Sequence, residues 1–279
     1  ADITPPPGAM MACFPRGGKP RRARGADDRL QAKALVLADD AQAVAICACD
    51  LTALRDVDVA RIGMAVAARA PHLAGPRTVL TATHTHAAPE TLYVFGNTPD
   101  DPWVRQMDER LAGAILAADA AREPVRLSVA TARVPLSHNR RVLDAAGRAG
   151  MSMEYEDGVT APAEDDELVV LRFDALASGA AAGPDALRAR AAEPRAGRPR
   201  AALCNFAAHA LTLGPANEHF SADYPGVACR HLEAALDGAP ALFLNGAAGN
   251  LHPRQCMREG REATEAIGRR LGEGAVEAL

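Results

Sequence analysis

The regular part of the chain opens with two apolar runs separated by a pair of aspartates. Residues 32–37 and 43–49 are almost entirely apolar, and Asp39 and Asp40 lie between them. Short apolar runs bounded by turn residues are typical of buried strands, and two such runs in close succession predict a β-hairpin.

The segment that follows changes from a continuous apolar run to a helical period. Val59, Ile62 and Val66 recur every three or four residues within 57–68, which predicts an amphipathic helix. Residues 78–83 are rich in Val, Leu and Thr and predict another strand. A strand, a helix and a strand in succession form a βαβ unit, so the strands at 43–49 and 78–83 should be parallel neighbours.

Similar patterns continue to the end of the chain. Residues 175–199 are rich in Ala, Gly, Pro and Arg, which is typical of a flexible surface insert. We expect a single α/β domain over residues 1–279, with a mixed β-sheet and flanking helices. Its further helices are predicted at 104–122, 225–236 and 262–279, and its further strands at 125–135, 168–173, 201–207 and 241–244.

Composition excludes several classes of protein. The chain is 48% hydrophobic and 24% charged, which is ordinary for a globular domain. Its best apolar stretch, 111–121, contains Asp119 and is too short to cross a bilayer. A net charge of −4 and 4% aromatic residues disfavour nucleic-acid binding. The first residues lack a signal-peptide pattern, so we expect a cytoplasmic location, with secretion left open. Oligomeric state is open as well.

Polar residues gather where the predicted strands end. In open α/β sheets, ligands bind outside the carboxyl ends of the strands, so these side chains should converge if their strands are neighbours. The residues concerned are Asp50, His84, His86, His209 and, in a small-residue loop, Asn245 and His252.

The two histidines in the Thr83–Pro89 segment offer the clearest candidate chemistry. His84 and His86 are two residues apart, so in extended backbone both imidazoles point to the same side. Such a pair suits metal ligation, or one metal ligand and one proton-transfer group. The alternative is a pair of loop histidines held by hydrogen bonds. None of the six cysteines forms a CxxC pair, and Cys47 and Cys49 are expected to be buried strand thiols.

Taken together, the segments resemble the neutral/alkaline non-lysosomal ceramidase family, specifically its amino-terminal catalytic domain and its short bacterial members. That family consists of zinc amidases that hydrolyse the N-acyl bond of ceramide to a fatty acid and a sphingoid base. The resemblance implies a zinc cofactor, a lipid amide substrate and a place in sphingolipid metabolism. The matching motifs, in the family's order, are Asp2-Ile-Thr-Pro-Pro, Ala34-Leu-Val-Leu, Cys49-Asp-Leu, Thr83-His-Thr-His-Ala-Ala-Pro, His138-Asn-Arg, Asn205-Phe-Ala-Ala-His, Ser221-Ala-Asp-Tyr-Pro-Gly and Asn245-Gly-Ala-Ala-Gly-Asn-Leu-His-Pro.

The resemblance implies roles for individual residues. His86 and His209 fall on the family's zinc ligands, and Arg140 falls on its substrate-facing arginine. A guanidinium in that position can stabilise the oxyanion of a tetrahedral intermediate. We expect His84 to act catalytically beside the ligands, and His84 or Asp50 to orient a ligand by hydrogen bonding.

Two departures from the family bear on the metal shell. The family completes its zinc site with a glutamate and a tyrosine farther along the chain, and we expect this carboxyl-terminal part to be absent here. A serine of the family's loop is replaced by His252. Candidates for completing the shell are therefore water, His84, His252 and Asp223, although Asp223 is placed equally well to cap a helix.

The sequence thus predicts a zinc-dependent amidase acting on a ceramide-like substrate. One alternative is a catalytically degenerate lipid-binding domain that keeps the fold without a complete metal shell. Another is a metal hydrolase of a different amide or ester. Metal content separates the first alternative from the prediction, and a panel of substrates separates the second.

Overall fold

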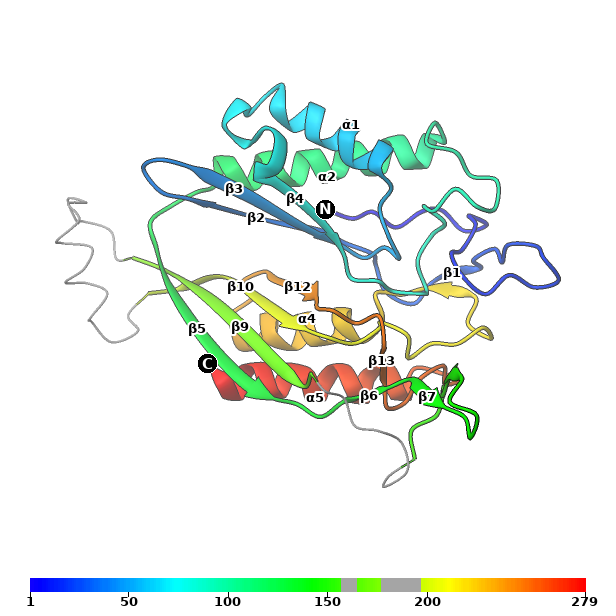
Figure 1. Ribbon diagram of the computed structural model, residues 1–279. Helices are drawn as coiled ribbons and strands as arrows, with labels where there is room; N and C mark the ends of the chain where they lie inside the picture. The colour runs from blue at the N-terminus through cyan, green and yellow to red at the C-terminus, as the bar shows by residue number, and fades with distance from the viewer. Residues whose placement is uncertain (157–164, 177–196) are drawn as a thin grey trace.

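Two β-sheets lie face to face between two layers of helices (Figure 1). The computed structural model describes residues 1–156, 165–176 and 197–279. Helices α1 and α2 cover the outer side of a three-stranded sheet, and α4 and α5 cover the outer side of a four-stranded sheet (Figure 1). The four layers place the inner faces of both sheets in the middle of the molecule.

The three-stranded sheet has the order β2–β3–β4 and follows the predictions closely. β2 (Ala32–Ala38) and β3 (Ala43–Cys49) form an antiparallel hairpin. β4 (Thr78–Ala82) pairs in parallel with β3 after the crossover helix α1 (Asp56–Ala67). Helix α2 (Pro102–Ala120) packs on the same side of the sheet, and Asp101 caps it by accepting from the Trp103 amide. The hairpin and the βαβ unit are therefore confirmed.

The four-stranded sheet has the order β12–β10–β9–β5. Its β9 runs antiparallel to both neighbours, whereas β10 and β12 are parallel to each other, so the sheet is mixed. The elements of this half are β5 (Val125–Arg133), β9 (Glu167–Ala175), β10 (Pro199–Phe206), β12 (Ala241–Asn245), α4 (Asp223–Ala235) and α5 (Glu262–Ala278).

The α/β class is confirmed, but the strands divide between two main sheets instead of joining one. The interface between the sheets is apolar, with Ala48, Leu203 and Leu242 at its centre. A strand that is buried on both faces has a continuous apolar run whether its partner lies in the same sheet or above it. The sequence pattern therefore cannot distinguish these two arrangements.

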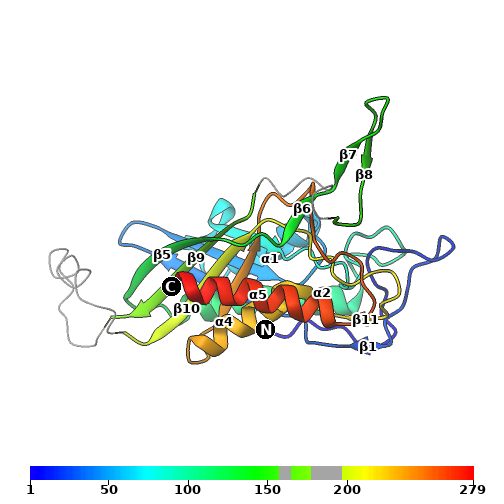
Figure 2. The ribbon, with the colours of Figure 1, turned by 90° about the horizontal axis from the view of Figure 1, so that it is seen from below.

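Short paired strands lie at the end of the molecule that carries the carboxyl ends of β4 and β10. β1 (Gly25–Ala26) pairs with β11 (His219–Phe220), and β6 (Ser137–Asn139) pairs with β13 (Leu251–Pro253). β7 (Arg141–Leu143) and β8 (Ala149–Met151) form a hairpin that projects from the body (Figure 2). Two 3₁₀ turns, Pro71–Leu73 and Gly75–Arg77, precede β4.

Three further expectations concern burial and the membrane. Cys47 and Cys49 are buried free thiols, as predicted. The predicted insert at 175–199 falls largely on residues 177–196, outside the described residues. Within the described ranges, no helix combines the length and apolar character that crossing a membrane requires.

Candidate metal centre

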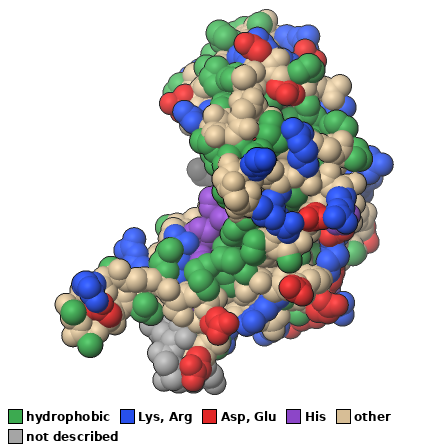
Figure 3. Space-filling view, turned by 90° about the vertical axis from the view of Figure 1, so that its right-hand side faces the viewer, with side chains coloured by type: hydrophobic (Ala, Val, Ile, Leu, Met, Phe, Trp, Pro, Cys, Tyr) green, Lys and Arg blue, Asp and Glu red, His purple; other side chains and the backbone are tan. Residues whose placement is uncertain are grey.

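Three histidines from the two sheets meet at one end of the sandwich. His84 and His86 follow β4, and His209 follows β10. The His84 backbone takes the left-handed conformation (φ 66°), which turns the chain sharply as it leaves the strand. The His86 amide donates to the Ala210 carbonyl at 3.1 Å, so main-chain hydrogen bonding holds the two segments together. Histidine side chains accordingly gather in a hollow of the surface (Figure 3).

The three imidazoles are spaced as metal ligands require. One ring nitrogen from each of His84, His86 and His209 lies within 4.8 Å of the other two. The Nε2 atoms of His84 and His86 are 3.5 Å apart, and the ring centroids of His84 and His209 are 4.8 Å apart. Two nitrogens that each form a bond of about 2.0–2.1 Å to one zinc ion lie about 3–4 Å apart, so small side-chain movements would bring all three to bonding distance.

Backbone carbonyls fix two of the rings in the tautomer that binds metal. His84 Nδ1 lies 2.7 Å from the Thr52 carbonyl oxygen, and His209 Nδ1 lies 2.7 Å from that of Ala248. A carbonyl oxygen can only accept, so each Nδ1 carries the proton and each Nε2 keeps its lone pair. Metal-bound histidines characteristically donate their second nitrogen to such an acceptor.

His86 is held differently, because its Nδ1 is buried without a hydrogen-bond partner among the described residues. Its ring packs near Phe14, with centroids 5.8 Å apart, and its Nε2 faces His84. A buried nitrogen without a protein partner is costly unless a bound group satisfies it. The donor set of three imidazoles is one that zinc accepts readily.

The electrostatic environment favours the neutral form of His86 and His209. Burial, together with the neighbouring His84 and His209, lowers the pKa of His86 to about 3. Burial also lowers the pKa of His209, with His84 and Arg140 contributing. Neutral imidazole is the form that binds a metal ion, so the ligand form predominates at neutral pH even before a cation arrives.

Arg140 lies beside this cluster and is oriented by His252. The Arg140 Nη1 atom is 2.8 Å from His252 Nε2, and the rings of His252 and His209 have centroids 5.0 Å apart. Arginine can only donate, so His252 Nε2 accepts and its Nδ1 carries the proton. That Nδ1 lies 3.5 Å from the Cys256 sulfur. The pairing of β6 with β13 places His252 directly opposite His138. His138 lies two residues before Arg140 in the chain, so the same pairing brings His252 close to Arg140.

His252 is therefore committed to Arg140 and stands apart from the group of three. It is fully buried, and burial lowers its pKa to about 3, with further contributions from His209 and Arg140. Burial raises the pKa of the Cys256 thiol to about 12, so the sulfur beside it stays protonated and neutral. The contacts favour a neutral His252 that holds the guanidinium in place.

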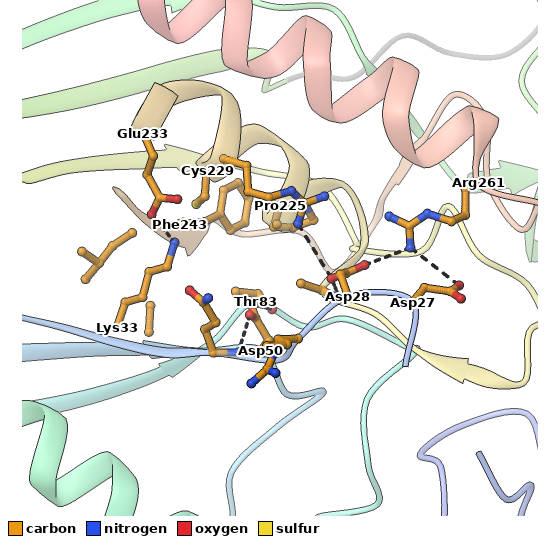
Figure 4. Close-up of a pocket in the computed structure, with 17 residues that line it drawn as sticks. Asp27, Asp28, Lys33, Asp50, Thr83, Pro225, Cys229, Glu233, Phe243 and Arg261 are labelled. Atoms are coloured by element: carbon orange, nitrogen blue, oxygen red, sulfur yellow. Dashed lines mark hydrogen bonds and ion pairs between the residues drawn. The ribbon is translucent and has the colours of Figure 1, made fainter. Parts of the chain in front are cut away.

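Asp50 lies in a polar cavity of about 380 Å³ that β2, β3, β12 and α4 line, and the three histidines do not line it (Figure 4). Its carboxylate accepts from the Gln31 amide at 2.9 Å and from the Thr83 hydroxyl at 3.3 Å. Burial raises the pKa of Asp50 to about 6, and these hydrogen bonds oppose the increase. Neither contact supports the expected role of Asp50 in orienting a histidine ligand.

Several other charged groups of this cavity pair with one another. Lys33 donates to Glu233 and to the Ala241 carbonyl, and Arg261 pairs with Asp28 at 3.0 Å (Figure 4). These pairs link the three-stranded sheet and the amino-terminal loop to α4 and α5, which indicates a structural role.

Asp223 and Asn245 stabilise the segments that carry the histidines. Asp223 is buried, and its carboxylate accepts from the amides of Thr212 and Tyr224, at 3.1 and 2.6 Å respectively. It therefore fixes the loop just after His209. The N-cap of α4 is Ala222, and no side chain caps the helix, so the capping role that the sequence left open for Asp223 is not the one the structure gives it. Asn245 donates to the Thr83 carbonyl at 3.2 Å and so ties β12 to the segment that carries His84.

Sequence reasoning missed the groups that orient the histidines. The acceptors are the main-chain carbonyls of Thr52, Ala248 and Leu251, and a carbonyl acceptor leaves no signature in residue type. The pairing of Arg140 with His252 was missed as well. The signal for it was present, because both residues belong to motifs that the sequence singled out.

Comparison with known proteins identifies the fold. No family model and no curated protein matches the chain. A crystal structure of neutral ceramidase from Pseudomonas aeruginosa matches all of this chain with a TM-score of 0.74 and 24% identity. A structure described as a ceramidase complexed with C2 matches it with a TM-score of 0.73 and 23% identity. The chain spans 43% and 42% of the lengths of those two chains. It therefore has the fold of part of the neutral ceramidase structures, in agreement with the resemblance in its sequence motifs.

Proposed function

We propose that the chain is a metal-dependent hydrolase of the neutral ceramidase family that cleaves an N-acyl amide bond in a ceramide-like lipid. The observation that carries the proposal is the convergence of His84, His86 and His209, with carbonyl acceptors behind two of the rings. The fold shared with neutral ceramidase structures supports the choice of family. All three histidines are proposed as ligands, which extends the pair that the sequence motifs implied.

The proposed metal is zinc. When bound, zinc would polarise the scissile carbonyl and lower the pKa of a water molecule toward about 7. The three histidines would hold it as neutral nitrogen donors, and the hydrogen bonds to the Thr52 and Ala248 carbonyls leave Nε2 of His84 and His209 free for that role.

Arg140 is proposed to stabilise the oxyanion of the tetrahedral intermediate. One of its five N–H donors is used on His252, which leaves others for the substrate oxygen. A fixed guanidinium loses little freedom when charge develops on that oxygen, so its interaction is strongest in the transition state. His252 is proposed as the positioning residue for Arg140, without direct contact to the reacting atoms.

The test is hydrolysis of an N-acylsphingosine by purified protein before and after removal of metal with a chelator. We expect release of fatty acid that stops on chelation and returns with zinc. An ester of the same acyl chain, measured in parallel, distinguishes an amidase from a metal esterase. Zinc binding without hydrolysis of any acyl substrate would contradict the proposed reaction, and lipid binding without metal would support the degenerate binding domain.

A further inference from the structure

The β7–β8 hairpin projects from the body as an arm beside the candidate metal centre (Figures 2 and 3). Every residue from 141 to 151 is exposed. The arm begins directly after Arg140, and the Ser152 amide closes its base by donating to the Arg140 carbonyl at 2.7 Å. The base of the arm is thus part of the site, whereas its far end makes no contribution to the body's core.

One face of the arm is apolar. Arg141 is paired with Met151 and Leu143 with Ala149, so these four side chains share a face. Leu143 is 74% exposed and Met151 is 63% exposed. We refer to Leu143, Ala149 and Met151 as the apolar face of the arm. A two-stranded hairpin is marginally stable alone in water, so large apolar side chains on such a hairpin indicate a surface that another phase or molecule covers.

The charges of the arm identify what covers this face. Arg148 pairs with Asp144 at 2.7 Å, whereas no carboxylate of the described residues lies within ion-pair distance of the Arg141 guanidinium. The apolar face therefore has a free positive charge at its edge. Two copies of the chain packed through this face would bring two Arg141 side chains close together, which is unfavourable. An anionic lipid surface offers both an apolar phase and a phosphate for the guanidinium.

We propose that the arm inserts Leu143 and Met151 into an anionic lipid–water interface and thereby holds the mouth of the metal centre against that surface. Binding of the arm to lipid requires no reaction. That this binding brings substrate to the metal centre rests on the proposed function. A lipid amide must leave a membrane to reach the histidines, and the arm projects beside the hollow in which they gather (Figure 3).

Flotation of the full chain with lipid vesicles tests the proposal. Vesicles are made of phosphatidylcholine alone or mixed with phosphatidylglycerol, and the variants are L143S/M151S and Arg141→Gln. We expect the double variant to lose at least about fivefold in bound fraction on the mixed vesicles. R141Q should weaken binding only to mixed vesicles, and the difference should shrink in high salt. Met64→Ser is the matched control, because Met64 is 67% exposed on α1, far from the arm, and should bind as the unaltered chain does.

Several outcomes would overturn the proposal. These are absence of binding by the unaltered chain, equal binding by L143S/M151S, and concentration-dependent self-association that this variant abolishes. The last result would assign the apolar face to a second copy of the chain. Hydrolysis of a water-soluble short-chain N-acyl amide separates this proposal from the proposed function, because L143S/M151S should retain it. Vesicle binding by a chain that hydrolyses no amide would support the arm and contradict the proposed function alone.

Discussion

The cavity around Asp50 and the histidine cluster are adjacent polar regions that meet at Thr83, and they use their polar groups in opposite ways. Thr83 faces the cavity around Asp50, and the next residue, His84, belongs to the histidine cluster. In the cavity, protein donors satisfy the carboxylates: Asp50 accepts from an amide and a hydroxyl, and Asp28 pairs with Arg261. In the cluster, backbone carbonyls accept only from Nδ1 of His84 and His209. The Nε2 atom of His84 faces His86, and the ring of His209 lies beside both others.

The difference separates a structural polar site from one built to bind. A polar group that the fold needs for its own stability is paired within the protein, whereas a ligand atom must remain unpaired until its partner arrives. Both regions contain titratable side chains at strand ends, and residue type alone placed Asp50 and His84 in the same predicted site. Only the hydrogen bonds assign them to different roles.

The largest expected effect is the loss of a metal ligand. His209→Ala should lower zinc affinity and kcat/KM for an N-acyl amide by about 100-fold or more, because it removes a neutral donor from a set of three. His72→Ala is the matched control, since His72 pairs with Asp119 on the surface and should change neither quantity. Retention of zinc by H209A would remove His209 from the proposed ligand set.

A smaller effect is expected where Arg140 meets His252. Arg140→Lys should lower kcat by about 100-fold with little change in KM, because an ammonium cannot keep the bond to His252 and also reach the oxyanion. His252→Ala should lower kcat by about 10-fold, and His252→Gln should restore part of it by offering an acceptor again. Steady-state kinetics on the same amide measure both series. Equal rates for H252A and H252Q would contradict positioning through the Nε2 acceptor.

Replacing Asp50 should affect stability and leave zinc binding unchanged. Its folded pKa of about 6 lies above the ordinary value of 3.8 for an aspartate. The folded state therefore loses stability as pH rises from about 4 to about 6, and the full loss applies above about pH 6. Asp50→Asn should therefore increase the free energy of unfolding by about 1–2 kcal/mol at about pH 7.5 and give no gain below about pH 4.

Urea unfolding at the two pH values measures this effect. Asp39→Asn is the control, because hydrogen bonds from the Ala41 and Gln42 amides lower the pKa of Asp39 and its replacement should give no gain. A D50N chain that is destabilised at both pH values would show that the charged Asp50 carboxylate stabilises the cavity network.

The smallest effect is expected at the residue between the two regions. Thr83→Val removes the hydroxyl that donates to Asp50 at 3.3 Å and leaves the backbone that leads to His84 intact. We expect a loss of about 0.5–1 kcal/mol in unfolding free energy and a change in zinc affinity of less than about twofold. A large fall in zinc affinity, measured by competition with a chromogenic chelator, would show that the cavity and the cluster are coupled.

Much of the fold could be predicted from local pattern. Apolar runs and turn residues give the β2–β3 hairpin, and the helical period of Val59, Ile62 and Val66 gives α1. The division into two sheets could not be predicted, because strand β3 is buried on both faces and its pattern does not specify whether a neighbour lies beside it or above it.

The candidate site was predictable in its residues and only partly in its arrangement. The spacing of His84 and His86, with the motif around His209, identified three side chains that the structure brings together. The roles of Asp50 and Asp223 depend on the backbone amides that their carboxylates meet, such as that of Gln31 for Asp50 and that of Thr212 for Asp223. The Gln31 contact lies at the end of the β2–β3 hairpin, so the hairpin could be predicted but the hydrogen bond to the Asp50 side chain could not, because it depends on side-chain orientation.

Calorimetric titration of the metal-free chain with zinc chloride tests the central claim most directly. We expect one zinc ion per chain, with binding weakened by about 100-fold or more when any one of His84, His86 and His209 is replaced by alanine, and unchanged in Asp50→Asn. Because burial lowers the pKa of His86 to about 3, zinc binding at about pH 7 should release few protons from this ligand. Zinc affinity that is absent, or that is the same in the histidine variants as in the unaltered chain, would contradict the account.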